Sequence, residues 1–312
     1  MAASPLITGA TGFAGSHLLD LLLNDHAAVH AWFNPRGRTP FHASDRVRWQ
    51  AVDLLDAAAV EAALREASPS VIYHCAGVAD VQAAWRAPAR ALEVNAIGTH
   101  RLLDAAAAAG FAGRVLVTGS ALVYERSTHA LTEDDPLAPV GPYAVSKLAQ
   151  EMATARSGLD VVLTRSFNHA GRRQDDSYVT SAFARQIADI ERGTAEPVLR
   201  VGNLDARRDV TDVRDVVRAY RALASSGRPH TPYNVCRGQA YRVGDLLEIL
   251  LSLASVAVDV QTDPARLRPS DNPVVLGSHD RLTRDTGWMP AIAIEQTLAD
   301  ILDYWRASAP AA

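Results

Sequence analysis

The 312-residue sequence contains only two cysteines and no long apolar run. Cys75 and Cys236 lie far apart and match neither a disulfide framework nor the spacing of zinc ligands, so we expect both to be core residues in a reducing compartment. The sequence also lacks a charged leader with an apolar segment, and it lacks the stretch of about 20 apolar residues that spans a membrane. These absences predict a soluble cytoplasmic protein with no membrane partner.

The sequence also has no excess of positive charge. The chain has 31 lysines and arginines against 35 aspartates and glutamates, a formal net charge of -4. The arginines are scattered among carboxylates, so there is no basic stripe for duplex phosphates, and we expect no nucleic-acid partner. His26 and His30 have a spacing found among metal ligands, but residues 25–28 are expected to form a loop between a helix and a strand, which would make the two side chains diverge. No metal site is predicted.

What the sequence does contain is a glycine-rich segment, LITGATGFAGSHLLDLLL, between its first apolar run and an amphipathic helix that begins near Ala14. Small residues let the backbone approach a pyrophosphate, whose negative charge is favoured by unpaired amides and the positive end of the helix dipole. The pattern predicts a dinucleotide site; the alternative is a tight turn that binds no ligand. The candidate contacts in this loop are Gly9, Thr11, Gly12, Phe13 and Gly15.

Short apolar runs with β-branched residues alternate with stretches rich in alanine and leucine. The strand candidates are PLIT, VHAWF, VIYHC, RVLVT and DVVLTR. This alternation predicts an α/β fold in which a Rossmann-type, doubly wound parallel sheet is covered by helices. We expect residues 1–166, with parts of 205–240, to form a dinucleotide-binding domain, and residues 167–204 and 241–312 to form a smaller C-terminal α/β portion that binds the substrate.

Helical spacing is clear at several places. The alanine-rich run that follows ALEVNAIGTHRLLD ends at Gly110, a natural helix stop, and predicts one long buried helix. Four further helices are expected in the C-terminal half, near residues 182–192, 213–225, 243–254 and 294–306. No internal repeat and no Pro- or Ser-rich linker is visible. The two parts of the chain should therefore pack around one cleft.

The end of the second expected strand bears on the choice of coenzyme. AWFNPRGR has no Asp or Glu to accept hydrogen bonds from the ribose of NAD, and Asn34, Arg36 and Arg38 stand there instead. Arginines in that loop would neutralise the 2′-phosphate of NADP. We therefore predict that NADP(H) is preferred and that NAD(H) remains possible; the alternative is a pair of solvated loop arginines.

Tyr143 and Lys147 in PYAVSK are four residues apart and therefore share one face of a helix. A phenol titrates near pH 10, so a nearby ammonium group would favour the phenolate enough for proton exchange with a sugar hydroxyl or ketone near neutral pH. The pair is a candidate acid/base site. The alternative is an exposed helix face with no catalytic role.

In their order along the chain, GxxGxxG, TGSALVY and PYAVSK resemble the motifs of the extended short-chain dehydrogenase/reductase family. The resemblance implies that Ser120, four residues before Tyr124, hydrogen-bonds the reacting oxygen, while Lys147 also holds the nicotinamide ribose. It implies that Asp53 and Leu54 of VDLLD lie beside the adenine. Asp53 could instead be the N-cap of the helix that follows.

Two further stretches are similar to the family's pattern. YHCAGVADVQ matches the loop beneath the nicotinamide, which implies backbone contacts from His74, Ala76 and Gly77. ALEVNAIGTHRLLDAA matches a helix in which Asn95 would lie behind the active site, or would satisfy a buried backbone kink. A four-helix dimer interface is common in the family, and the alanine-rich and PYAVSK helices are apolar enough to form one, so we expect a homodimer.

The C-terminal half resembles the branch of the family that contains GDP-mannose 4,6-dehydratases and GDP-4-keto-6-deoxy-mannose reductases. The resemblance is carried by RSFNHAGRRQ, the run from YVTSAFARQ to RDVVRAY, YNVCRGQ, DPARLRPSDNP and TGWMPAIAIEQTLADILDYWR. It implies a nucleotide-sugar substrate, GDP-linked, whose diphosphate or sugar contacts Asn168. Arg208 and Arg268 would bind the diphosphate, or form surface ion pairs. Val179 and Val198 would line the guanine pocket, or belong to the core.

Leu122 indicates which reaction the resemblance implies. In this branch a 4,6-dehydratase needs a carboxylate two residues after the catalytic Ser or Thr, and leucine cannot act as a base. The expected reaction is therefore NADPH-dependent reduction of the 4-keto group of a nucleotide-linked 4-keto-6-deoxyhexose, giving GDP-D-rhamnose or its C4 epimer. Tyr143 would protonate the new alkoxide while Ser120 stabilises its charge. Arg172 and Arg173, in a GRRQDD loop that departs from the branch, are expected to mark altered substrate contacts.

Three alternatives remain open from the sequence. An NDP-sugar epimerase would use the same Tyr/Lys pair but return the hydride to the opposite face of the sugar, and a 4,6-dehydratase belongs to the same family. A regulatory protein would bind a dinucleotide without catalysis. Net consumption of coenzyme distinguishes the reductase from the epimerase.

Overall fold

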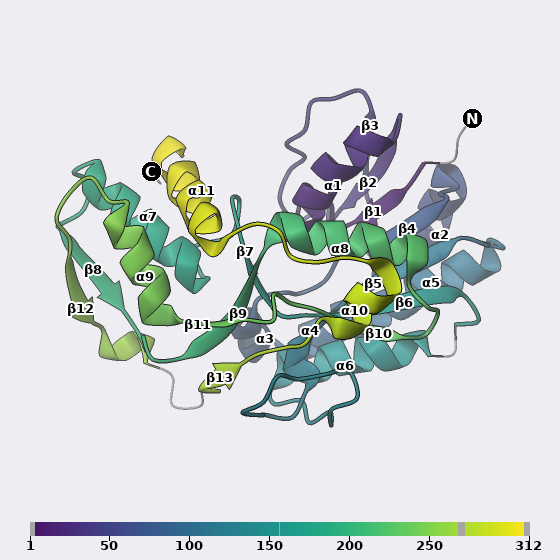
Figure 1. Ribbon diagram of the computed structural model, residues 1–312. Helices are drawn as coiled ribbons and strands as arrows, with labels where there is room; N and C mark the ends of the chain where they lie inside the picture. Colours follow the sequence, from purple (N-terminus) through teal and green to yellow (C-terminus); the bar gives the residue numbers. More distant parts are fainter. Residues whose placement is uncertain (1–3, 156, 268–271, 309–312) are drawn as a thin grey trace.

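Seven parallel strands run in the order β10-β6-β5-β4-β1-β2-β3 in the computed structural model, which describes residues 4–155, 157–267 and 272–308 (Figure 1). Their bounds are β1 Leu6–Thr8, β2 Val29–Phe33, β3 Val47–Ala51, β4 Val71–His74, β5 Arg114–Ser120, β6 Asp160–Ser166 and β10 Pro232–Val235. The chain moves outward from β1 through β2 to β3, then crosses to β4 and continues the other way. The direction therefore switches between β1 and β4, and the predicted Rossmann-type doubly wound sheet is confirmed.

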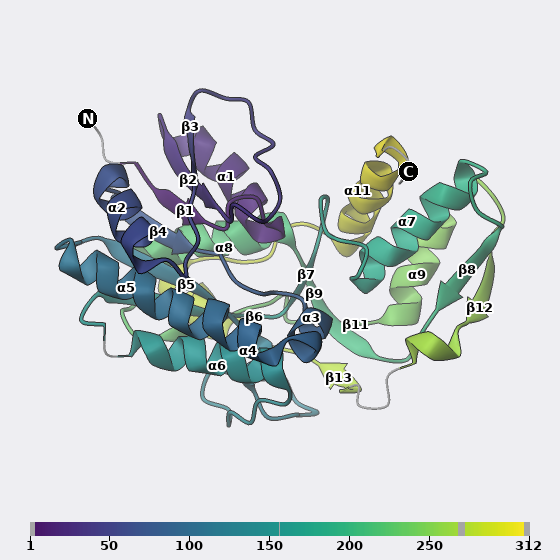
Figure 2. The same cartoon turned by 180° about the vertical axis from the view of Figure 1, so that it is seen from behind.

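Helices cover both faces of this sheet. On one face α1 (Phe13–Asp25, purple) lies beside α8 (Val213–Ser226, green), although the two are far apart in the sequence (Figure 1). The other face is covered by α2 (Ala57–Ala67), α5 (Gly98–Ala108) and α6 (Pro142–Thr154) (Figure 2). In the part of the chain that the structure describes, no helix is long and apolar enough to cross a lipid bilayer.

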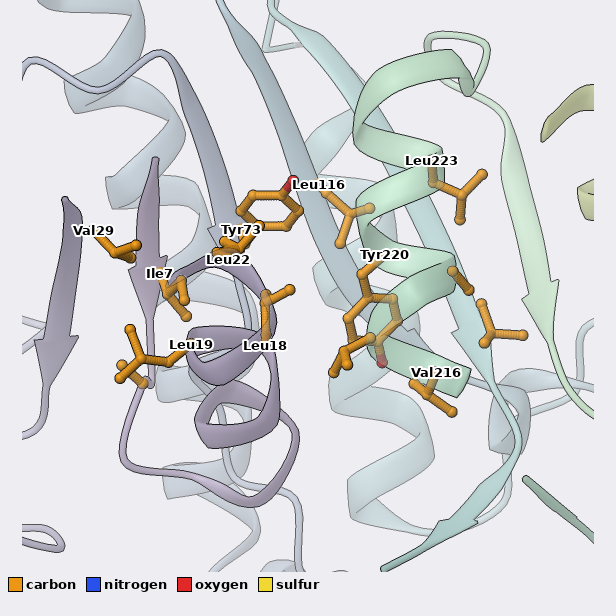
Figure 3. Packing of buried hydrophobic residues seen from close by; sticks show 14 of the residues in the cluster. Ile7, Leu18, Leu19, Leu22, Val29, Tyr73, Leu116, Val216, Tyr220 and Leu223 are labelled. Atoms are coloured by element: carbon orange, nitrogen blue, oxygen red, sulfur yellow. The ribbon is translucent and has the colours of Figure 1, made fainter. Parts of the chain in front are cut away.

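The strands between the helical layers are apolar on both faces. Successive side chains of a strand point to opposite sides of the sheet. Ile7 and Tyr73 pack against α1 and α8 in one buried cluster (Figure 3), whereas their neighbours Leu6 and Ile72 belong to the cluster on the other face. Because both faces are covered, the inner strands β1, β4, β5 and β6 appear in the sequence as largely continuous apolar runs, whereas the edge strand β3 alternates polar and apolar residues.

The expected alanine-rich helix is present, but one turn of it has π-helical hydrogen bonding. α4 (Pro88–Leu92) continues through this π turn (Glu93–Ile97) into α5. The helix ends just before Gly110, whose φ of +67° lies in the left-handed region. Asn95 is fully buried within the π turn. The predicted helix is thus confirmed, and the irregularity considered at Asn95 is a local widening of the helix.

A smaller lobe follows β6 and contains its own buried core (Figures 1 and 2). Its central strand β9 pairs with β7, β11 and β13, and a separate pair joins β8 to β12. The strands of this lobe are β7 Asn168–Ala170, β8 Val198–Val201, β9 Arg207–Asp212, β11 Ala240–Arg242, β12 Asp259–Thr262 and β13 Val274–Val275. The remaining helices of the fold are α3 Val81–Arg86, α7 Val179–Glu191, α9 Val243–Ser252, α10 Asp280–Thr286 and α11 Ile294–Ala307. The four helices expected in this half of the chain are therefore present as α7, α8, α9 and α11.

Candidate active site

The glycine loop lies at the carboxyl end of β1, against the loop that follows β4. Gly9 has a φ of +69°, and a β-carbon there would lie 2.7 Å from the backbone of Ala76. A β-carbon on Gly15 would collide with the carbonyl oxygen of Gly9, to which the Gly12 amide donates a hydrogen bond of 2.9 Å. Helix α1 begins at once, with Gly12 as an N-cap that has no side chain. This close-packed loop and open helix start fit a dinucleotide pyrophosphate.

The loop after β2 presents Arg36 at the surface, where its side chain is 72% exposed. The Asn34 side chain accepts a hydrogen bond from the Arg36 amide at 2.9 Å and so fixes the turn. The Arg36 guanidinium forms an ion pair with Asp53, in the loop after β3. A hydrogen bond from the Leu55 amide, followed by the bond from Arg36, lowers the pKa of Asp53. An arginine held in this way stands at the end of β2, where a 2′-phosphate would be recognised.

Asp53 does not cap the helix that follows it. The N-cap of α2 is Asp56, whose carboxylate accepts a hydrogen bond of 3.0 Å from the Ala59 amide. Leu54 is buried against Gly98 at the start of α5. The alternative interpretation of Asp53 as an N-cap is therefore wrong, because the cap lies one helical turn further along the chain.

Residues 172–178, which include most of the GRRQDD departure, link the smaller lobe to three elements at the carboxyl edge of the sheet. These elements are α1, the loop after β2 and the loop after β4. The contacts are the hydrogen bond from His17 Nε2 to the Arg172 carbonyl (2.8 Å), the Arg173–Asp20 ion pair, the Arg38–Asp175 ion pair (3.1 Å) and the bond from the Tyr178 hydroxyl to the Ala79 carbonyl (3.3 Å). The 172–178 segment thus lies across the elements that carry the expected coenzyme contacts.

Arg173 was expected to contact the substrate, but the contacts that it makes in the structure are with other parts of the chain. Its guanidinium pairs with Asp20 on α1 and lies 5.4 Å from the centre of the Phe41 ring. Asp20 on α1 and Phe41 in the segment between β2 and β3 both belong to the part of the chain that carries the expected coenzyme contacts. Arg172, by contrast, is exposed and engages α1 only through its backbone carbonyl.

Ser120, Tyr143 and Lys147 are brought together from two elements. Ser120 is the last residue of β5, and the other two residues lie on successive turns of α6. α6 begins after Gly141, whose φ of +87° requires glycine, and has proline in its first turn. A side-chain hydrogen bond joins Ser120 to Tyr143. The three candidate catalytic residues therefore share one site at the carboxyl edge of the sheet.

The protonation states of the pair suit a proton donor. Burial raises the pKa of Tyr143, and the hydrogen bond with Ser120 offsets only part of that rise, so the phenol is protonated at neutral pH. Burial lowers the pKa of Lys147 to about 8. Its Nζ donates to the Thr118 carbonyl at 2.8 Å and to Gln150 Oε1 at 2.6 Å. Gln150 was not among the residues expected from the sequence, because its position one turn beyond Lys147 is equally compatible with an exposed helix face.

His74 is fully buried beneath the site, between two threonines. Its Nδ1 is 2.8 Å from Thr8 Oγ1 on β1, and its Nε2 is 2.8 Å from Thr99 Oγ1 on α5. Thr99 donates its own proton to the Asn95 carbonyl, so it accepts from Nε2, and Nδ1 accepts from Thr8. Burial lowers the pKa of His74 to about 3. The ring is therefore neutral, and it joins β1 and β4 to α5.

Asn95 holds the loop after β4 against α6. Its side chain accepts a bond of 2.7 Å from the Val78 amide and donates to the Val78 carbonyl (3.1 Å) and to Ser146 Oγ (2.9 Å). A β-carbon on Gly77 would lie 2.7 Å from Asn95 Oδ1 and 3.8 Å from Lys147 Nζ. Asn95 therefore acts behind the site, by fixing the backbone of residues 77–78 beside Lys147.

The expected substrate contacts lie in the smaller lobe. Asn168 on β7 and Arg208 on β9 belong to paired strands. Val179, the first residue of α7, is exposed, and Val198, the first of β8, is half-buried. The alternative that Val179 is a core residue is therefore wrong. Arg268 lies outside the described residues.

The His, Cys, Asp and Glu side chains bear on whether the chain holds a metal ion. Within residues 4–155, 157–267 and 272–308, no three His, Cys, Asp or Glu side chains are arranged to hold a metal ion. His26 is the C-cap of α1, and His30 lies within β2. His26 thus lies in the expected junction between helix and strand, whereas His30, expected in a loop or at the surface, is buried in the strand itself.

Comparison with known proteins places this geometry among nucleotide-sugar enzymes. A family model described as GDP-mannose 4,6 dehydratase matches residues 6–301. GDP-6-deoxy-D-mannose reductase of Pseudomonas aeruginosa is 39% identical over 307 residues, 96% of each chain. The solved RMD of the same organism, complexed with NADPH, has a TM-score of 0.86 at 36% identity over 97% of this chain and 99% of that one. UDP-glucose 4-epimerase of Thermus thermophilus, complexed with NAD, has a TM-score of 0.86 at 27% identity over 98% and 100%.

Proposed function

The chain belongs to the GDP-mannose 4,6 dehydratase family, and on that premise we propose that it uses NADPH to reduce the 4-keto group of a GDP-linked 4-keto-6-deoxyhexose, giving GDP-D-rhamnose or its C4 epimer. The observation that carries this proposal is Leu122. It lies two residues after Ser120, its amide donates to Ser120 Oγ at 3.2 Å, and its side chain is exposed. A leucine at that point supplies no base for dehydration, whereas reduction does not need one. The 39% identical reductase supports the same reaction.

The reduction adds a hydride to the carbonyl carbon and a proton to its oxygen. The bound coenzyme supplies the hydride. Tyr143, protonated at neutral pH, donates its hydroxyl proton to the oxygen as negative charge builds there. The Ser120 hydroxyl stabilises that charge, and the Lys147 ammonium stabilises the tyrosinate that Tyr143 becomes.

Residues from several loops would hold the coenzyme. The glycine loop suits the pyrophosphate, and the exposed Arg36 guanidinium suits the 2′-phosphate of NADPH. The proposed set is Gly9, Thr11, Gly12, Phe13, Gly15, Asn34, Arg36, Asp53, Leu54, Ala76, Gly77 and Lys147. The solved NADPH complex of the 36% identical RMD supports NADPH as the preferred coenzyme.

The substrate would lie between the two lobes. We place the dinucleotide on residues 1–166 with parts of 205–240, and the nucleotide sugar on residues 167–204 and 241–312. Asn168 and Arg208, on paired strands, would contact the diphosphate or sugar, together with Arg268. Val179 and Val198 would flank the guanine. The exposed position of Val179 at the start of α7 supports a ligand contact there.

We further propose a cytoplasmic homodimer that packs through the helices on one face of the sheet. Four apolar side chains on α4, the π turn and α6 are exposed: Leu92, Ile97, Val145 and Met152, the last at 69%. The adjoining helices on which they lie suit the predicted four-helix interface. Met152→Glu should therefore convert the dimer to a monomer in sedimentation at micromolar concentration. Met289→Glu, at an exposed position outside these helices, should leave the dimer intact. A wild-type monomer would contradict the proposal.

The central experiment follows NADPH oxidation by the purified protein with enzymatically prepared GDP-4-keto-6-deoxy-mannose, and identifies the sugar product by NMR. We expect one NADPH to be consumed for each alcohol formed. Tyr143→Phe keeps the ring but removes the proton, so it should lower kcat by roughly a hundredfold or more while leaving NADPH binding in place.

Other results would assign other functions. Interconversion of C4 epimers without net loss of NADPH would identify an epimerase, as the likeness to a UDP-glucose 4-epimerase allows. Formation of the 4-keto sugar from GDP-mannose would identify a 4,6-dehydratase and overturn the argument from Leu122. Coenzyme binding with no turnover of any of these sugars would favour a regulatory protein.

A further inference from the structure

Gln150 is a polar side chain in an unexpected place. It lies on the face of α6 that carries Tyr143 and Lys147, three residues beyond the lysine, and only 1% of its surface is exposed. Its Oε1 accepts the bond of 2.6 Å from Lys147 Nζ. Its Nε2 is buried and has no hydrogen-bonding partner among the described residues. Because a buried, half-satisfied amide is unfavourable, packing alone does not account for a glutamine here.

The two acceptors of Lys147 set the direction of its remaining N–H bond. An ammonium group has three N–H donors. One donates to the Thr118 carbonyl, which is fixed in β5, and a second donates to Gln150. Among the described residues, no third acceptor of Nζ accompanies these two. Gly77 lies beside Nζ, and a β-carbon there would be 3.8 Å from it. The third N–H is therefore left for the coenzyme ribose, which is proposed to lie beside Gly77.

The groups around Lys147 are otherwise neutral. His74 and Cys75 on and after β4 face it, and burial lowers the pKa of His74 to about 3 and raises the pKa of Cys75 to about 12. Tyr143, on its own helix, is protonated at neutral pH. Among the described residues, no carboxylate acts on Lys147. Its charge is therefore stabilised by two neutral oxygens, those of Thr118 and Gln150.

We propose that Gln150 is a positioning residue that keeps the Lys147 ammonium protonated and leaves its third N–H for the coenzyme ribose. This inference rests on the proposed reductase function. Gln150 itself touches neither coenzyme nor sugar; it acts through Lys147. The ammonium donates to a backbone oxygen of Thr118 and to a side-chain oxygen of Gln150. Only the second oxygen can be removed by substitution.

Two substitutions should move the pH dependence in opposite directions. Gln150→Met preserves length and burial but removes the oxygen. The alkaline limb of kcat/KM, which we expect near pH 8 in the wild type from the pKa of Lys147, should therefore fall by about one pH unit. Gln150→Glu places a carboxylate beside the ammonium and should raise the same limb by about one unit. Gln296→Met, on the exposed side of α11, serves as the matched control and should leave the limb unchanged.

A second readout needs no sugar substrate. The dissociation constant of NADPH, measured by fluorescence titration across the same pH range, should show the same opposite shifts, because the charged lysine contributes to coenzyme binding. If these shifts occur without turnover of the GDP-sugar, the proposed reaction fails while the role of Gln150 stands. Wild-type pH profiles in both variants, or a shift in the same direction in both, would overturn the proposal. If Gln150→Met does not fold, Gln150→Glu decides alone, since structural damage does not extend activity to higher pH.

Discussion

The neutral His74 gives this protein a specific sensitivity to acid. Burial lowers the pKa of His74 from 6.5 to about 3. Between those values the unfolded chain binds a proton that the folded chain does not, so the free energy of unfolding rises with pH across this window. The contribution of His74 is therefore fully present above pH 6.5 and is lost as the pH falls toward 3.

The size of the effect follows from the difference in pKa. One pKa unit corresponds to about 1.4 kcal/mol. At pH 5, which is about 1.5 units below the unfolded value, the protein should have lost about 2 kcal/mol of its free energy of unfolding through His74 alone. A glutamine at this position keeps polar groups between Thr8 and Thr99 but does not titrate. His74→Gln should lower stability at neutral pH, and it should remove this part of the acid dependence.

Urea unfolding at pH 7.5 and pH 5.0, at one protein concentration, tests the argument. We expect the free energy of unfolding to fall by about 2 kcal/mol more in the wild type than in His74→Gln. His100→Gln, a substitution of an exposed histidine on α5, should leave the wild-type difference unchanged. If His74→Gln loses as much stability as the wild type between the two pH values, the buried ring is not the source of the acid sensitivity.

Two further substitutions probe the coenzyme side. Arg36→Gln should raise the KM for NADPH by about tenfold and leave the KM for NADH nearly unchanged, because one charge-assisted contact with the 2′-phosphate is lost; equal changes for both coenzymes in steady-state assays would argue against that contact. Arg173→Ala removes the ion pair with Asp20 and should speed NADPH release several-fold in stopped-flow displacement, since the 172–178 segment then holds α1 less firmly. An unchanged release rate would mean that the segment does not limit coenzyme exchange.

The sequence was most informative where one local rule decides the structure. Glycines between a strand and a helix, and apolar runs buried on both faces, are local patterns, and they led directly to the Rossmann-type sheet. Ser120 and Tyr143 could be associated before the structure because TGSALVY and PYAVSK resemble family motifs that share one active site. Asp53 and Asp56 illustrate the limit of such rules. Both precede α2, and only the position of the Ala59 amide shows which of them is the cap.

Features set by tertiary contacts were harder to anticipate. The spacing of ALEVNAIGTHRLL is that of an ordinary α-helix, and the π turn is associated with the bonds of Asn95 to the loop after β4. Arg173 stood in a motif associated with the substrate, but its charge is neutralised by Asp20 from a distant part of the chain. Gln150 has neighbours that favour a helix, and nothing in its local sequence shows that it is buried. The pairing of β8 with β12 is likewise a contact between segments far apart in the chain.

The π turn lets this helix carry one residue more than a regular α-helix of the same rotation. Each residue of an α-helix advances by about 100° around the axis, whereas i→i+5 bonding spreads one turn over more residues. The turn therefore absorbs the extra residue locally, and α5 keeps the rotation that directs Leu102 and Leu103 into the core and Thr99 toward His74. Deleting one residue between 93 and 97 should restore regular hydrogen bonding and leave these contacts of α5 in place. The loss would fall on the bonds from Asn95 to Val78, and so on the loop beside Lys147.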